Sequence, residues 1–287
     1  MFYRRRTDEE TITRVVTLVG HGCPIPAIEV AYGFQAQTVR EWVEARETHA
    51  EAVHHATVVQ PRDLVQVQAD EIHVKTQAGV LWMAMAMMVS TRLWLGGAVS
   101  AHRDRDVIGR LVAIVAACAQ WGPLLFVTDG VSTYSDVMRK AFRTRQTGTG
   151  GRPRLVGWPD LAIAQVVTQY AGRAVTGTIH RLVHGTVQTF LTLLWSTPGC
   201  QVLNTAYIER LNGTFRSCLA SLGRRTRLSI DLPAHLWRHY SLACRYLTHD
   251  TTLTSVFRAR DYGYAAVSPP HGLLNGTLRT SDGVRHW

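Results

Sequence analysis

Three carboxylates stand at positions where charged side chains are poorly placed for burial, or where they cap a helix. Asp70 ends an alternating apolar run, Asp129 follows the apolar run 124–127, and Glu209 lies near the start of a helix that begins at about Asn204. A charge at the end of an apolar strand is costly unless something pairs with it. Ligand sites of open α/β sheets lie at the carboxyl ends of strands.

Carboxylates that converge from different elements are what two-metal phosphoryl transfer requires. One ion activates the attacking oxygen and the other stabilises the leaving oxygen. Taken singly, each of the three has a structural explanation, either as an Asp in a turn or as a Glu that complements the helix dipole. Together, in a basic chain, they predict a metal-dependent site that acts on a phosphodiester.

The first 55 residues show helical periodicity and predict three helices. Thr7 and Glu10 form a capping-box signature at the start of the first helix. The second is expected to run to Gly33, where a turn needs a positive φ, and the third to begin near Ala36. This spacing is typical of a helix-turn-helix, although Glu29 stands where a small residue usually packs.

In a helix-turn-helix, the third helix would be the recognition helix, and it would turn polar side chains to the major groove of DNA. The residues expected there are Gln37, Thr38 and Arg40. An ordinary three-helix bundle is the alternative for this segment.

From Leu64 the periodicity changes to two, which predicts strands. We expect a half-buried strand at 64–70, further strands over 80–89, 93–99 and 124–127, and helices over 106–119, after Ser132 and from Asn204. The Gly-, Thr- and Arg-rich segment 143–159 is expected to be a loop, and 160–203 is left unassigned. This order predicts an α/β fold, a mixed sheet flanked by helices.

The composition favours an acidic partner. The formal net charge is +10 and the pI is near 9.8, and arginine supplies nearly all of the positive charge. Arginine presents a fork of donors that matches phosphate oxygens. The five cysteines show no C-x-x-C spacing, and neither a signal peptide nor a membrane span is predicted. We therefore expect a cytoplasmic protein whose partner is nucleic acid.

Four segments resemble the conserved blocks of one family. Residues 69–75, 128–130 and 207–212 are similar to the three catalytic blocks of insertion-sequence-one-like DDE transposases, and 100–106 also resembles that family. The similarity covers roughly residues 10 to 250, and its most specific part is the I-E-R-L-N block. The resemblance implies an RNase H-like catalytic core over 59–255, preceded by an all-α helix-turn-helix domain over 1–58.

The resemblance also implies what the site residues do. Asp70, Asp129 and Glu209 would be the catalytic residues and would ligate two Mg2+ ions, for which Mn2+ could substitute, while Glu71 would support the site. The partner would be double-stranded DNA, at element ends and target, in the cytosol of a bacterium. Synapsis of two ends implies a homo-oligomer. Besides the recognition-helix residues, the expected DNA contacts are Arg103, Arg105, Arg152, Arg154, Arg210, Asn212, Arg216, Arg224 and Arg225.

The chain departs from the family pattern at both ends. Family members often carry a cysteine-rich, zinc-binding segment just before the point where this sequence begins, and residues 256–287 do not continue the usual tail. We expect that tail to be poorly ordered or divergent. Two alternatives to an active transposase follow. One is a non-catalytic helix-turn-helix DNA-binding protein or inactivated transposase remnant, and the other is an RNase H-like nuclease without strand transfer.

Overall fold

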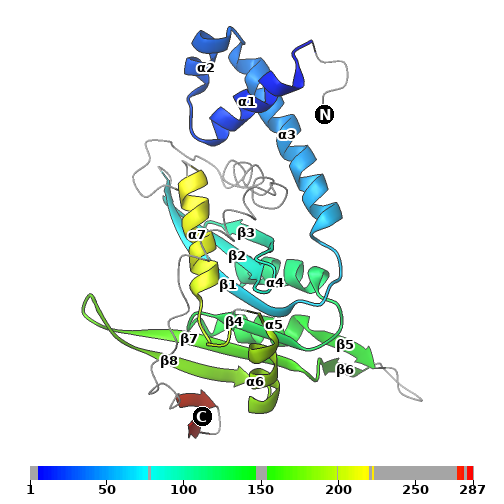
Figure 1. Ribbon diagram of the computed structural model, residues 1–287, viewed down its shortest axis with the longest axis vertical. Helices are drawn as coiled ribbons and strands as arrows, with labels where there is room; N and C mark the ends of the chain where they lie inside the picture. Colours follow the sequence, from blue (N-terminus) through cyan, green and yellow to red (C-terminus); the bar gives the residue numbers. More distant parts are fainter. Residues whose placement is uncertain are drawn as a thin grey trace.

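The computed structural model describes residues 6–76, 79–146, 154–198, 200–219, 222, 277–280 and 283–286. A group of three helices comes first along the chain, and a larger α/β part built on one sheet follows (Figure 1).

The three helices are α1 (Glu9–Gly20), α2 (Ile25–Tyr32) and α3 (Ala36–Thr57). They pack around an apolar cluster formed by Ile12, Val15, Val16, Ile28, Val39 and Trp42. The turn after α2 places Gly33 at a φ of 72°, as predicted. The predicted capping box is wrong by one residue. Asp8, not Thr7, caps α1, because its carboxylate accepts a hydrogen bond from the backbone nitrogen of Thr11 at 2.8 Å.

The main sheet is mixed and has the strand order β10-β9-β8-β7-β4-β1-β2-β3. Strands β1, β2 and β3 form an antiparallel meander, β4 pairs parallel with β1, β7 pairs parallel with β4, and β8 returns antiparallel to β7. The bounds are β1 Val65–Thr76, β2 Gly79–Met88, β3 Trp94–Ser100, β4 Leu124–Thr128, β7 Leu161–Ala171, β8 Ala174–His184, β9 Thr277–Thr280 and β10 Gly283–His286.

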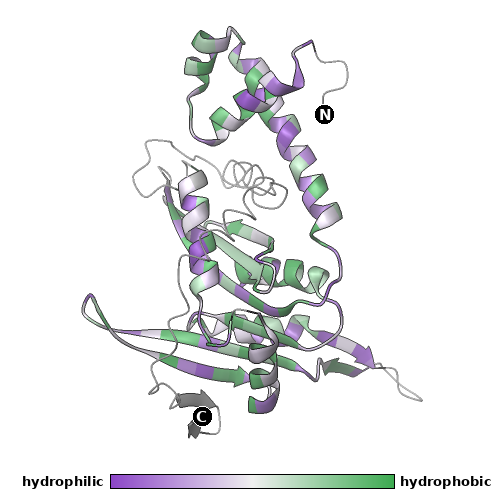
Figure 2. Cartoon of the chain, viewed as in Figure 1, coloured by the Kyte–Doolittle hydropathy of each residue, from purple (hydrophilic) through white to green (hydrophobic). Residues whose placement is uncertain are grey.

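Helices cover both faces of this sheet. One face packs against α4 (Arg105–Cys118) and α5 (Thr133–Ala141), and the other against α6 (Val187–Ser196) and α7 (Ala206–Cys218). Figure 2 shows the apolar character of the central strands between these layers. The predicted mixed α/β sheet flanked by helices is therefore confirmed.

Strand β1 is more deeply buried than its sequence pattern predicts. Gln66 and Gln68 have no exposed surface, so the expectation of a half-buried strand is wrong. The polar face of the strand lies under α6 and α7. The Gln68 amide is satisfied there by backbone groups that precede and begin α7.

The segment 143–159 is only partly the loop that was expected. It contains a two-stranded hairpin, β5 (Arg143–Gln146) paired with β6 (Arg154–Gly157). Most of these residues are exposed, so these strands are stabilised by backbone pairing and not by apolar burial. Their sequences therefore lack the apolar alternation that would predict a strand. The unassigned segment 160–203 supplies β7, β8 and α6.

Two further expectations concern the tail and the membrane. Of residues 256–287, expected to be poorly ordered or divergent, the structure describes only β9 and β10, and β9 joins the sheet beside β8. Within the described ranges, none of the helices combines the length and apolar character needed to cross a membrane.

Candidate metal centre

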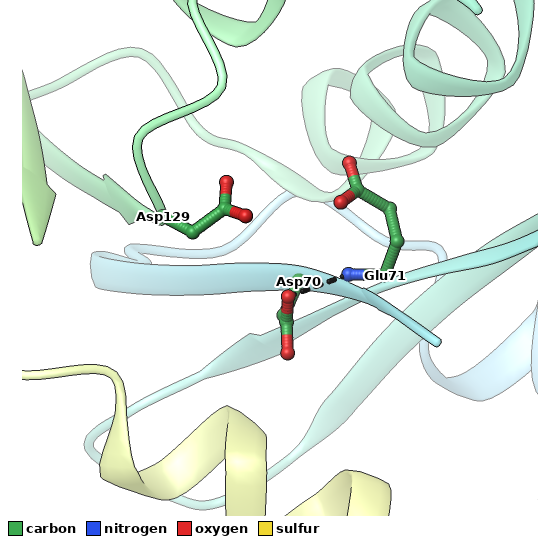
Figure 3. Close-up of side chains that lie close together, drawn as sticks. All are labelled: Asp70, Glu71 and Asp129. Atoms are coloured by element: carbon green, nitrogen blue, oxygen red, sulfur yellow. Dashed lines mark hydrogen bonds between the residues drawn. The ribbon is translucent and has the colours of Figure 1, made fainter. Parts of the chain in front are cut away.

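The fold brings Asp70 and Asp129 to the same end of the sheet. Asp70 lies within β1, and Asp129 directly follows β4. These strands are parallel neighbours, and Gln68 pairs with Val127, so Asp70 and Asp129 lie side by side two residues later. The expected end of the first strand at residue 70 is wrong, because β1 continues past Asp70 to Thr76, whereas β4 ends at Thr128. Ligand atoms of Asp70, Glu71 and Asp129 all lie within 4.8 Å of one another (Figure 3).

Asp70 and Glu71 point to opposite faces of the sheet, because neighbouring residues in a strand alternate. Figure 3 shows the two side chains leaving β1 in opposite directions, with Asp129 to one side of both. Glu71 lies on the face that carries Val67 and Ala69, which is the face covered by α4 and α5. Asp70 lies on the face of α7. Asp129 comes from a strand end, and it is therefore close to carboxylates on both faces.

Asp70 is held by two donors in a largely buried position. The side-chain nitrogen of Asn212, on α7, donates to Asp70 Oδ2 at 2.7 Å, and the backbone nitrogen of Glu71 donates to Asp70 Oδ1 at 2.8 Å. Burial raises the pKa of Asp70 to about 6, against the lowering effect of the Glu71 amide. The charges of Asp129, Glu71 and Glu209 raise this pKa further.

Glu71 is paired with an arginine from another element. Its side chain has no exposed surface, and Oε2 lies 2.6 Å from the Nη2 atom of Arg103. The same Nη2 atom lies 3.2 Å from Asp129 Oδ2. Burial raises the pKa of Glu71, while the hydrogen bond and charge of Arg103 lower it, and the nearby Tyr134 hydroxyl also lowers it. Arg103, expected from sequence to contact DNA, thus lies in the carboxylate cluster.

The third predicted ligand lies beside this cluster but is not one of its three members. Glu209 is exposed in the first turn of α7, and its Oε1 accepts a hydrogen bond from Thr205 Oγ1 at 2.7 Å. It lies on α7, the helix that packs against the Asp70 face of the sheet, and its charge raises the pKa of Asp70.

Gln68 fixes the start of α7 against β1. Its side-chain oxygen accepts from the backbone nitrogen of Ile208 at 3.0 Å, and its side-chain nitrogen donates to the backbone oxygen of Asn204 at 2.7 Å. Sequence reasoning missed this residue. Its alternation with apolar neighbours is also typical of a solvent-facing strand position, and only the location of α7 distinguishes the two.

The remaining residues, those predicted to contact DNA, differ in how exposed they are. Asn212 is buried against Asp70, which suits support of that carboxylate better than the expected phosphate contact. Arg216 and Thr38 are partly buried. Side chains exposed on their elements are those of Gln37 and Arg40 on α3, Arg105 on α4, Arg154 on β6 and Arg210 on α7. Arg152, Arg224 and Arg225 lie outside the described residues.

The donor set fits a hard divalent cation. Asp70, Glu71 and Asp129 offer only carboxylate oxygens, which are the ligands that Mg2+ prefers. Two of the three carboxylates, those of Glu71 and Asp129, pair with the guanidinium of Arg103, and Asp70 is paired with no cation among the described residues. A cation in this cluster would offset the repulsion that raises the pKa of Asp70.

The chain matches no protein-family model, and none of the curated proteins matches it.

Proposed function

We propose that this chain is a DDE transposase, which cuts and joins DNA at the ends of an insertion sequence with two divalent metal ions. The observation that carries the proposal is that residues from the three sequence blocks lie close together beside β1 and the end of β4. Asp70 lies beside Asp129, and Asn212 of the third block donates its hydrogen bond to Asp70. Residues far apart in sequence thus surround one carboxylate cluster.

The sheet supports the RNase H-like part of this proposal. An antiparallel meander of β1, β2 and β3, followed by β4 and β7 parallel to β1, is compatible with an RNase H-like core. Asp70 lies in β1 and Asp129 directly follows β4, the neighbouring strand in the middle of the sheet, and α7 packs beside them through Asn212.

The proposed reaction is attack on a phosphodiester, first by water and then by the freed 3′-hydroxyl on target DNA. Asp70 and Asp129 would hold the metal ions, with Glu209 completing the set. Bound divalent ions would supply the positive charge that activates the attacking oxygen and stabilises the leaving one. Asn212 keeps a lone pair of Asp70 engaged and so fixes the orientation of that carboxylate.

The helices α2 and α3 support DNA binding in this proposal. Gly33 makes the left-handed turn between them, and the Glu29 carboxylate accepts a hydrogen bond from the backbone nitrogen of Ala36 at 2.7 Å. Glu29, which weakens the sequence match to a helix-turn-helix, therefore caps the third helix. Gln37 and Arg40 are exposed in the first turns of α3, where a recognition helix contacts base edges.

Cleavage of a supercoiled plasmid in Mn2+ tests the enzymatic part of the proposal. The wild-type protein should nick the plasmid, and Asp129→Asn and Glu209→Gln should reduce nicking to background. Asp136→Asn is the matched control, because it removes an exposed carboxylate that pairs with Arg139 on α5. Joined DNA products distinguish a transposase from a nuclease without strand transfer.

One observation favours a non-catalytic DNA-binding protein as the second candidate. The carboxylate of Glu209 engages Thr205 instead of joining the cluster of Asp70, Glu71 and Asp129. Duplex binding with no nicking in either Mg2+ or Mn2+ would select this candidate and reject the enzyme.

A further inference from the structure

One guanidinium nitrogen lies between two carboxylates that belong to different strands. Arg103 Nη2 is 2.6 Å from Glu71 Oε2 and 3.2 Å from Asp129 Oδ2. Arg103 itself stands in the short segment between β3 and α4, and its side chain is 36% exposed. The partner Glu71 side chain is fully buried. A partly exposed cation thus neutralises a buried anion.

A divalent cation bound by the same two carboxylates would exclude this nitrogen. Metal–oxygen distances in Mg2+ sites are about 2.0–2.1 Å, shorter than either contact that Arg103 makes. An ion at that distance from both oxygens would take the space between them, and its charge would repel the guanidinium. Arg103 and the metal therefore compete for Glu71 and Asp129.

Arg103 also lies near an aromatic ring while it pairs with the carboxylates. Its guanidinium carbon lies 5.1 Å from the ring centroid of Trp82, on β2. An aromatic face attracts a guanidinium at this range. A rotation of the arginine side chain toward Trp82 would release the carboxylates and leave the cation over an aromatic face that attracts it.

We infer that Arg103 is an internal counter-ion, which holds the metal-free cluster together and is displaced toward Trp82 when a divalent cation binds. The inference rests on the metal site of the proposed function and adds Glu71, which belongs to the same carboxylate cluster, to its ligands. A fixed structural ion pair would behave in the opposite way. It would orient Asp129 for the metal, and its loss would weaken metal binding.

Titration calorimetry of Mn2+ into the metal-free protein separates these two roles. Arg103→Gln removes the competing charge, so it should bind Mn2+ on the order of tenfold more tightly than wild type. Arg103→Lys keeps a cation and should stay close to wild type. Arg105→Gln is the matched control, because it removes an exposed arginine two residues away, and it should change affinity less than about twofold.

The outcomes of this titration are distinct. Equal or weaker Mn2+ binding by Arg103→Gln overturns the inferred displacement of Arg103. This holds even if Asp129→Asn loses Mn2+ binding and so shows that the metal site exists. A gain in Arg105→Gln as large as that in Arg103→Gln also overturns the displacement, because general electrostatics would then explain both. Absence of Mn2+ binding in every protein overturns the metal site and the displacement together.

Tryptophan fluorescence follows the displacement in a protein whose Arg103 is unaltered, and so does not depend on the folding of Arg103→Gln. Mg2+, which does not itself quench, should change the emission of the wild-type protein as the guanidinium moves against Trp82. Trp82→Phe removes one of eight tryptophans and should abolish that change. An emission change that persists in Trp82→Phe, or no change in wild type, contradicts the inference.

Discussion

Asn212 on α7 donates a hydrogen bond to Asp70 on β1, with 2.7 Å between Nδ2 and Oδ2. Asn212 is only 3% exposed, so water cannot easily replace either partner. The contact therefore couples two properties that are usually separate, namely the position of the helix and the protonation of a carboxylate in the candidate metal centre.

Loss of this contact should destabilise the fold. Asn212→Ala leaves the Asp70 carboxylate with one donor fewer in a desolvated position, so the free energy of unfolding at neutral pH should fall by about 1–3 kcal/mol. Urea unfolding measures the change. Thr214→Ala is a control on the same helix, because its hydroxyl bonds only to the backbone oxygen of Arg210. A loss in Thr214→Ala equal to that in Asn212→Ala would contradict the coupling.

The raised pKa of Asp70 predicts a pH-dependent effect of Asp70→Asn. The pKa lies at about 6 in the folded protein and at 3.8 ordinarily, so the folded state binds this proton more tightly than the unfolded state. The charge of Asp70 then costs stability progressively as pH rises from about 4 to about 6.

Asp70→Asn should therefore be more stable than wild type above pH 6, by up to roughly 3 kcal/mol, and should match it below pH 4. Urea unfolding at the two pH values, without metal, checks this difference. The variant should at the same time lose the stabilisation that Mn2+ gives to wild type. An Asp70→Asn protein that is less stable than wild type at neutral pH would refute the assignment of a costly buried charge.

Two buried glutamines on one face of β1 predict contrasting effects. Gln68 bonds backbone groups of Asn204 and Ile208, whereas the Gln66 amide contacts only the sulfur of Cys200, at 3.6 Å, and its oxygen has no partner in the described part of the chain. Gln68→Met should cost about 2–4 kcal/mol of unfolding free energy, because it leaves two backbone groups unsatisfied.

Gln66→Met should be close to neutral, because it replaces a poorly satisfied amide by an apolar side chain of similar volume. Thermal unfolding of both variants gives the comparison. Equal destabilisation would mean that side-chain shape in the core, and not the attachment of α7, sets the cost.

Much of the fold follows from periodicity, and the exceptions have physical causes. The alternation around Val67, the apolar run before Asp129 and the turn at Gly33 each predict the element that the structure shows. Periodicity fails where strands are made by backbone pairing alone, as in the exposed hairpin of β5 and β6. It also wrongly predicts that Gln68 faces solvent, because a glutamine that bonds to the start of a helix cannot be told apart by sequence from one on the surface.

The site is predicted in part. Asp70 and Asp129 can be placed together because β1 and β4 are parallel neighbours, and this needs only the strand order. The pairing of Arg103 with Glu71 cannot be foreseen, because it depends on where the segment between β3 and α4 crosses the sheet edge. Nothing in the sequence distinguishes Arg103 from the other arginines expected to contact DNA, whereas in the structure it pairs with two carboxylates.

The hairpin of β5 and β6 predicts a second DNA contact, outside the three N-terminal helices. Arg145 and Arg154 are exposed on its two strands, on neighbouring rungs and therefore on opposite faces of the ribbon, and they form no ion pair among the described residues. A two-stranded ribbon fits the major groove, and unpaired arginines suit phosphates.

The double variant Arg145→Gln/Arg154→Gln should weaken binding to a random-sequence duplex and lower the salt slope of the binding constant by about 1, because one face of the ribbon, and so one of the two arginines, faces the groove. Fluorescence anisotropy over a range of salt concentrations measures the slope. The control Arg14→Gln/Arg139→Gln removes the same charge from arginines that already pair with Glu10 and Asp136. Its slope should stay near that of wild type. Equal slopes for the two double variants would show that total charge, and not the hairpin, governs the affinity for DNA.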